Sequence, residues 1–142
     1  GLITDAIHEF ELAARDPARE CVSQSMIGML HTQAGDLDAA TDAFLRGLHA
    51  TEKTSDQELA LTYEIGSAYE ARKNLEQALY YFQGVARINP SYKDVRGSVA
   101  ERISSLEKEM SGALPAKSAP KPSIIGTGDE FDAAFDDLFN PK

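Results

Sequence analysis

Apolar side chains recur along residues 2–110 at the spacing of amphipathic helices. Near the start of the chain, Ile3, Ile7 and Phe10 stand three or four residues apart, which places them on one face of a helix. The same period returns in five later segments, with polar residues at the intervening positions. The pattern predicts six helices, over residues 2–14, 18–33, 37–52, 57–72, 75–88 and 91–110.

Short polar signals separate these helices. An aspartate or asparagine followed by proline, at positions 16–17 and 89–90, can cap the free N–H groups of the helix that begins there. Gly35 permits the left-handed turn that ends a helix, and Ser55 with Glu58 has the spacing of a capping box. The turns are short, so consecutive helices are expected to pack as antiparallel hairpins.

Residues 59–90 carry a spaced set of small, aromatic and proline residues. Counted from Leu59, the set occupies positions 8, 11, 20, 24 and 32, and it consists of Gly66, Tyr69, Ala78, Phe82 and Pro90. The glycine lets two backbones approach closely, the alanine is small where a neighbouring helix lies, and the phenylalanine fills the space between hairpins. This spacing resembles the tetratricopeptide repeat, a helix–turn–helix unit of about 34 residues.

Earlier parts of the chain repeat that set. The matching residues are Gly28, Ala40 and Phe44, and before them Ile3, Ala6 and Phe10. The step from Ala40 to Ala78 exceeds one such unit by four positions, and the extra residues are expected in a loop near residues 54–57. His31 and Glu52 depart from the pattern, because the next unit has tyrosine and proline at those places.

The resemblance implies an all-α fold in which antiparallel helix hairpins stack as an α-solenoid over residues 1–110. It divides this region into a half repeat over 1–17, repeats over about 18–54 and 55–90, and a capping helix over 91–110. The apolar face of the capping helix has Val95, Val99, Ile103 and Leu106, and its charged residues, Arg96 and Arg102 among them, are expected to face solvent. Because the chain starts inside a repeat, we expect it to be the C-terminal end of a longer array, with apolar surface uncovered at its N-terminus.

Residues 111–128 have a different composition, with three prolines among alanine, serine, glycine and lysine. A segment with so few bulky side chains cannot bury enough surface to order itself. The composition therefore predicts a flexible linker within a disordered tail.

Residues 129–139, DEFDAAFDDLF, have one apolar and one acidic helical face. The apolar residues are Phe131, Phe135, Leu138 and Phe139, and the acidic ones include Asp132 and Asp136. Burial of four such apolar side chains gains about 6–12 kcal/mol, whereas ordering about ten residues costs about 10–20 kcal/mol. The segment is therefore expected to be unfolded alone, and to fold as a recognition helix on an apolar groove rimmed by Lys or Arg. The alternatives are a chance apolar cluster or a part of a neighbouring domain.

The charge of the chain restricts the class of partner. Residues 1–110 hold 18 acidic and 11 basic side chains and the remainder holds five and three, so both parts are negative and the total is −9. The sequence has no basic stripe for nucleic acid or an anionic membrane surface, and no apolar run approaches the ~18 residues of a membrane helix. Basic or neutral proteins are the expected partners. The Ala-rich, Trp-free array would suit a bacterial cytoplasmic protein.

The sequence carries no recognisable catalytic or metal-binding pattern. His8, His31 and His49 fall on three different predicted helices, and no pair of them has metal-ligand spacing. A Gly-rich phosphate loop and a nucleophile elbow are also missing from the sequence. We expect Cys21 to be a small, buried or half-buried thiol rather than a reactive one. We therefore expect no enzyme activity, no metal and no cofactor.

The resemblance implies a concave face lined by the first helix of each repeat. The residues that it places there are Val22, Ser25, Met29, Thr32, Ala60, Tyr63, Ser67 and Glu70. The lysines and asparagines with which one subclass of the family clamps a C-terminal carboxylate are absent from these places. The predicted groove is neutral to apolar, which suits the apolar face of a helix or an extended peptide. The alternative is that Met29 and Tyr63 only pack the array.

These features together predict a non-catalytic protein-interaction scaffold. The groove is expected to bind a peptide or helix of one partner, and the acidic-aromatic tail to recruit a second protein. The alternative is self-association or autoinhibition, in which the tail docks on its own array or on a neighbouring copy.

Overall fold

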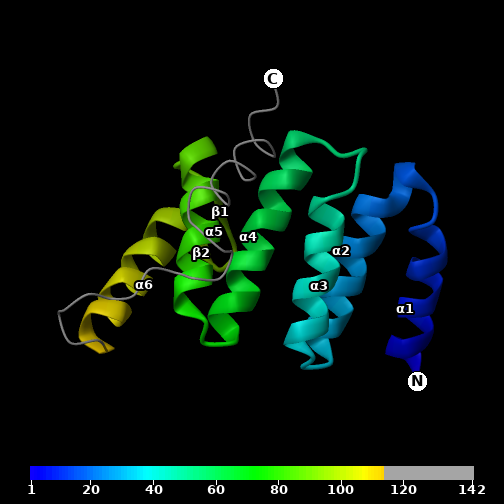
Figure 1. The fold of residues 1–142 in the computed structure, drawn as a ribbon, viewed down its shortest axis with the longest axis horizontal. Helices are drawn as coiled ribbons and strands as arrows, with labels where there is room; N and C mark the ends of the chain where they lie inside the picture. The colour runs from blue at the N-terminus through cyan, green and yellow to red at the C-terminus, as the bar shows by residue number, and fades with distance from the viewer. Residues whose placement is uncertain (114–142) are drawn as a thin grey trace.

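The computed structural model describes residues 1–113, which form helices and one short β-hairpin (Figure 1). The helices are α1 (Leu2–Ala13), α2 (Pro17–Gln33), α3 (Leu37–Leu48), α4 (Ser55–Ala71), α5 (Leu75–Ile88) and α6 (Val99–Ala113). The hairpin pairs β1 (Lys93–Asp94) with β2 (Gly97–Ser98) in antiparallel register. Each helix packs against the next one along the chain. The prediction of an all-α fold is confirmed.

Side chains cap the starts of α2 to α6, whereas α1 begins at Gly1 without a side-chain cap. The Asp16 carboxylate accepts a hydrogen bond from the Ala18 N–H at 3.0 Å, and Pro17 occupies the first helical position. Helix α4 begins with a reciprocal capping box between Thr54 and Gln57. The capping box was expected at Ser55, so that prediction is wrong by one residue.

The pairs α2–α3 and α4–α5 share the same internal packing. A Cβ atom added to Gly28 would lie 2.4 Å from the Phe44 ring, and one added to Gly66 would lie 2.8 Å from the Phe82 ring. Both phenylalanines are buried. Each pair therefore depends on a glycine that lets an aromatic ring lie directly against the backbone of its first helix.

The turns inside the two pairs also match. Gly35 has φ +82° and Lys73 has φ +63°, both in the left-handed region. In each turn the backbone N–H after that residue, at Asp36 or Asn74, donates to a carbonyl five residues earlier at 2.9 Å. Glycine adopts this conformation freely, whereas Lys73 adopts it under strain.

Two apolar clusters form the core. One gathers around Phe44, Leu48, Leu61 and Ile65 between α2, α3 and α4, and the other around Phe82, Val85, Val99 and Leu106 between α4, α5 and α6. Among the described residues, no buried side-chain nitrogen or oxygen lacks a hydrogen-bond partner. Helix α4 contributes to both clusters, so it connects the two halves of the core.

The C-terminal part differs from the prediction of one helix over 91–110. Helix α6 begins at Val99, and the β-hairpin lies in the stretch before it. The Asn89 side chain caps a local turn at the Ser91 N–H, and Gly97 takes φ +129°. Val95 lies at the tip of the hairpin, fully exposed, so its predicted place on an apolar helical face is wrong.

Helix α6 was expected to begin at Pro90, but it begins after Ser98, which forms a capping box with Glu101. The Ser98 hydroxyl accepts from the Glu101 N–H at 3.1 Å, and the Glu101 carboxylate accepts from the Ser98 N–H at 3.1 Å. These hydrogen bonds lower the pKa of Glu101. The two residues have capping-box spacing in the sequence, a signal that the period of the apolar positions does not carry.

Helix α1 forms one end of the described structure (Figure 1). It contains no buried residue, and the side chains of Leu2, Ile3 and Leu12 are exposed. Residues 111–113 belong to α6 rather than to a linker. The rest of the predicted linker over 111–128 and the predicted recognition helix over 129–139 lie outside the described residues.

Candidate functional site

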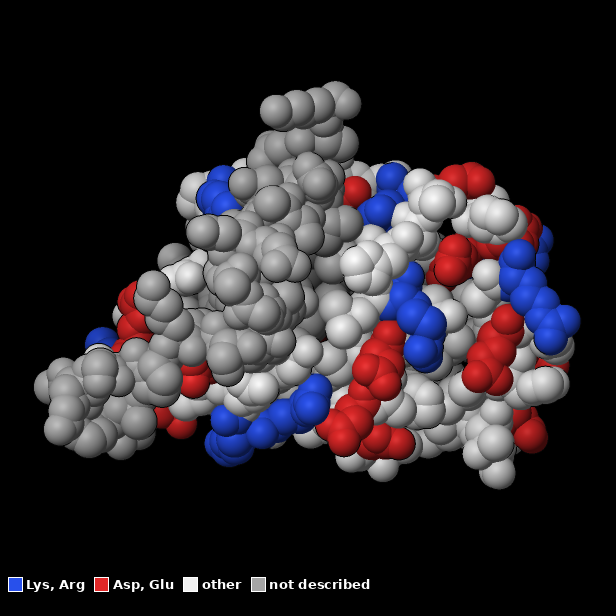
Figure 2. Space-filling model, viewed as in Figure 1, with Lys and Arg blue, Asp and Glu red and all other residues white. Residues whose placement is uncertain are grey.

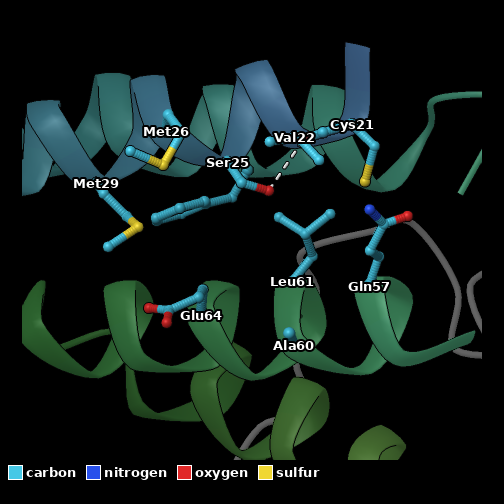
Figure 3. A pocket seen from close by; sticks show the side chains of 10 residues that line it. Cys21, Val22, Ser25, Met26, Met29, Gln57, Ala60, Leu61 and Glu64 are labelled. Atoms are coloured by element: carbon cyan, nitrogen blue, oxygen red, sulfur yellow. Dashed lines mark hydrogen bonds between the residues drawn. The ribbon is translucent and has the colours of Figure 1, made fainter. Parts of the chain in front are cut away.

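Helices α2 and α4 leave a cleft of about 190 Å³ between them. Its lining residues are Cys21, Val22, Ser25, Met26, Met29, Phe44, Gln57, Ala60, Leu61 and Glu64. Side chains from the two helices face one another across this space (Figure 3). The lining is mainly apolar, and a single carboxylate, that of Glu64, is its charged group.

Small side chains keep this cleft open. Ala60 on α4 and Ser25 on α2 both line it (Figure 3). The Ser25 hydroxyl donates to the Cys21 carbonyl of its own helix at 2.9 Å, so it does not reach across the gap. The thioether side chains of Met26 and Met29 form one end of the cleft, and such side chains adapt easily to an incoming group.

Four of the predicted groove residues, Val22, Ser25, Met29 and Ala60, line the cleft. Val22 is 51% exposed and Met29 is 49% exposed. Met29 therefore does more than pack the core. Thr32 is exposed on α2 beyond the lining residues, and its hydroxyl donates to the Gly28 carbonyl at 2.9 Å.

The other predicted groove residues are Tyr63, Ser67 and Glu70. They contact the C-terminal segment, which is the β-hairpin and α6, residues 93–113. Tyr63 is 1% exposed, and its hydroxyl donates to the Gly97 carbonyl of β2 at 3.0 Å. Burial raises the pKa of Tyr63, although the hydrogen bond from Arg102 opposes the shift. The prediction of an accessible groove is wrong for Tyr63, because the β-hairpin and α6 cover it.

Arg102 holds this closed region together. Its guanidinium lies 4.8 Å from the centre of the Phe82 ring, and it donates to the Tyr63 hydroxyl at 3.1 Å and the Ser67 hydroxyl at 3.4 Å. It also forms an ion pair with Glu70. Burial alone would lower the pKa of Arg102, but Glu70 and Tyr63 together outweigh burial and raise the pKa. The prediction that Arg102 faces solvent is therefore wrong.

Arg96 connects the β-hairpin to the edge of the cleft. Its guanidinium donates to both carboxylate oxygens of Glu64, at 3.2 and 2.9 Å, and also pairs with Asp94. It lies 5.1 Å from the centre of the Tyr63 ring. Burial alone would raise the pKa of Asp94, but hydrogen bonds from Arg96 hold it below its ordinary value.

Charged side chains elsewhere on the visible face are mixed in sign. Where described residues show in Figure 2, basic side chains lie next to acidic ones. No Lys or Arg belongs to the cleft lining. The cleft is thus an apolar surface with one carboxylate at its edge, that of Glu64, which shares Arg96 with Asp94.

The residues weighed for catalysis do not come together. His8 lies on α1, His31 on α2 and His49 at the end of α3. Within residues 1–113 no three His, Cys, Asp or Glu side chains are placed to hold a metal ion. Cys21 is buried at one end of the cleft, and burial raises its thiol pKa, which disfavours the reactive thiolate. In the same range, no helix is long and apolar enough to span a membrane.

Comparisons with protein-family models, curated protein sequences and solved structures find no match to this chain.

Proposed function

We propose that this chain is a non-catalytic protein-interaction scaffold of the tetratricopeptide type, which binds a peptide or helix of a partner in the α2–α4 cleft. The observation that carries the proposal is the exposure of Val22 and Met29 beside an open apolar cleft. Large apolar side chains gathered around a concave surface are typical of binding sites.

The repeat assignment is supported by contacts that recur in the two helix pairs. They include the pairing of Gly28 with Phe44 and of Gly66 with Phe82, and the left-handed turns at Gly35 and Lys73. In a stacked array of this kind, α2 and α4 are the first helices of successive units and line the concave side. The proposal thus places the cleft where such an array offers its binding face.

A selection from a random peptide library against the full chain tests the proposal. Ala60→Arg would place a long side chain across the cleft, and Ala71→Arg makes the same change at an exposed site near the end of α4. Enriched peptides should lose at least about tenfold in affinity for Ala60→Arg and little for Ala71→Arg. Enriched peptides that bind both variants equally would contradict the proposal.

The tail is the second part of the proposal. We assign residues 129–139 as a motif that recruits another protein, because their sequence alternates acidic and aromatic residues at helical spacing. Replacing Phe131, Phe135 and Phe139 by alanine in the full chain should remove one class of partner and leave cleft binding intact. If all partner interactions survive this change, the tail has no recruiting function.

Self-association through α1 is a second candidate, favoured by the exposure of Leu2, Ile3 and Leu12. Stacking of this face against another copy would bury them. Light scattering at about 100 μM would then show a species larger than a monomer. A monomer that persists at this concentration excludes this candidate.

A further inference from the structure

The α2–α4 cleft and the α4–α6 contact occupy the same place in successive units. Adding 38 to the number of a cleft residue gives its counterpart: Phe44 corresponds to Phe82, Leu61 to Val99, and Glu64 to Arg102. Phe44 and Leu61 pack in the first cluster as Phe82 and Val99 pack in the second. The two places can therefore be compared residue by residue.

The space beside Phe82, between α4 and α6, is filled by a side chain, whereas the space beside Phe44, between α2 and α4, is an open cleft. In the first, the long side chain of Arg102 lies over the Phe82 ring at 4.8 Å. In the second, the residue at that position is Glu64, whose carboxylate is held at the edge by Arg96. The cleft that borders Phe44 is the space that Arg102 fills in the next unit.

The residues that line the α2–α4 cleft favour a side chain of a different kind from Arg102. Arg102 is satisfied by Tyr63, Ser67 and Glu70, whereas the counterparts of the first two are Ser25 and Met29. A guanidinium deep in the cleft would lose those polar partners. An apolar side chain fits better, and a cavity of about 150 Å³ already accommodates a benzene ring.

Charge decides what should flank that apolar side chain. Glu64 is the charged group of the lining, and it shares the Arg96 guanidinium with Asp94, so two carboxylates and one guanidinium leave one net negative charge at this edge. Residues 1–110 hold 18 acidic against 11 basic side chains. A Lys or Arg beside the inserted side chain would be attracted to this edge. The chain's own residues 124–142 carry five acidic side chains and one lysine, so the same field repels them.

We infer that the α2–α4 cleft binds a cationic amphipathic segment of a partner protein, which inserts a large apolar side chain beside Phe44 and places a Lys or Arg near Glu64. The inference rests on the proposed function, and it adds the chemistry of the partner. It also assigns the chain's own tail to a different surface.

Four labelled peptides test it by fluorescence anisotropy against the full chain, at low and high salt. Three are helix-forming peptides of equal length: one with a leucine stripe and lysine flanks, one with the stripe and glutamate flanks, and one with lysine flanks and alanine in place of leucine. The fourth is residues 124–142 of this chain. The lysine–leucine peptide should bind best, with Kd at or below about 100 μM.

Variants locate the binding. Ala60→Arg should weaken the lysine–leucine peptide at least about tenfold, whereas Ala71→Arg should leave it unchanged. Glu64→Gln should weaken it about two- to fivefold and reduce its salt dependence. Thermal unfolding of each variant confirms that the fold is retained.

The possible failures are distinguishable. If the glutamate-flanked peptide or residues 124–142 bind as tightly as the lysine–leucine peptide, and Ala60→Arg weakens them, the cleft is a binding site and the inferred charge is wrong. If the alanine peptide binds as well as the leucine peptide, no apolar side chain is inserted and the inference is also wrong. If Ala60→Arg affects none of the peptides, both the inference and the proposed function fail.

Discussion

Helix α4 contacts α2 on one side and α6 on the other, and the two contacts differ in what lies over a buried phenylalanine. At Phe82, the C-terminal segment closes the contact through Arg102 and the β-hairpin, which cover Tyr63. At Phe44, the equivalent place remains a cleft with Met29 and Val22 exposed beside it. The contact at Phe82 is thus closed and the one at Phe44 is open, and the closing groups are Arg102 and the β-hairpin.

Truncating the two phenylalanines gives the largest expected effect. Phe82→Ala should lower the free energy of unfolding by about 3–5 kcal/mol, because it leaves a cavity under Arg102 and removes the ring that contacts Tyr63. Phe44→Ala should cost less, because its cavity would join a cleft that is already open to water. Urea unfolding of both variants measures this, and an equal or larger loss for Phe44→Ala would break the comparison.

Arg102 and Glu64 occupy equivalent positions but should contribute unequally to stability. Arg102→Ala should lower the free energy of unfolding by about 1–3 kcal/mol, because Glu70 and the Tyr63 hydroxyl lose a charged partner in a largely buried place. Glu64→Ala should cost less than about 1 kcal/mol, since its side chain is 33% exposed and Arg96 keeps Asp94. Chemical unfolding of both variants gives the two values. If Arg102→Ala lowers the free energy of unfolding by less than Glu64→Ala does, Arg102 does not stabilise the contact between α4 and α6.

The sequence predicted the two helix pairs well but not how the second one is closed. The positions of Gly28, Phe44, Gly66 and Phe82 follow from helical period and volume, and the structure brings each glycine against its phenylalanine. Helical period alone cannot reveal that a β-hairpin replaces the first part of the helix predicted over 91–110. The signals in the sequence were local: a glycine at position 97, and Ser98 with Glu101 at capping-box spacing. In the structure Gly97 takes φ +129°, and Ser98 and Glu101 cap α6.

The same limit applies to the predicted groove. The resemblance placed Val22, Ser25, Met29 and Ala60 on one face, and these four residues line the cleft. It could not show that Tyr63 would be covered, because the covering group, Arg102, comes from a segment 39 residues away in sequence. The charge of Glu70 was a usable signal, since a carboxylate in an apolar groove requires a cationic partner.

The equivalence of the turns in the two helix pairs can be tested by substituting the residue with positive φ in each turn. Gly35→Ala should destabilise the fold by about 1–2 kcal/mol, because φ +82° is unfavourable for a residue with a Cβ atom. Lys73→Gly should stabilise it by about 0.5–1 kcal/mol, because it removes strain at φ +63°. Thermal or urea unfolding measures both. If Lys73→Gly is destabilising, the two turns are not equivalent.

The smallest expected effect concerns the pH dependence of the closed end. Asp94 has a pKa below its ordinary value of 3.8, so its stabilising contribution is present above that value and is lost as the pH falls through the folded pKa. Asp94→Asn should therefore be less stable than the wild type at neutral pH, by less than about 1 kcal/mol. The difference should shrink in acid. Urea unfolding at several pH values measures it, and a difference that grows as the pH falls would show that Asp94 does not stabilise the hairpin through its charge.

The chain's three methionines allow the most direct test of the open cleft. Met26 and Met29 line it, whereas Met110 is half-buried on α6. In a titration of the full chain, labelled at its methionine methyl groups, with the lysine–leucine peptide, the NMR signals of Met26 and Met29 should shift and that of Met110 should stay unchanged. A shift of Met110 without any shift of Met26 and Met29 would place binding on the C-terminal segment and contradict the account.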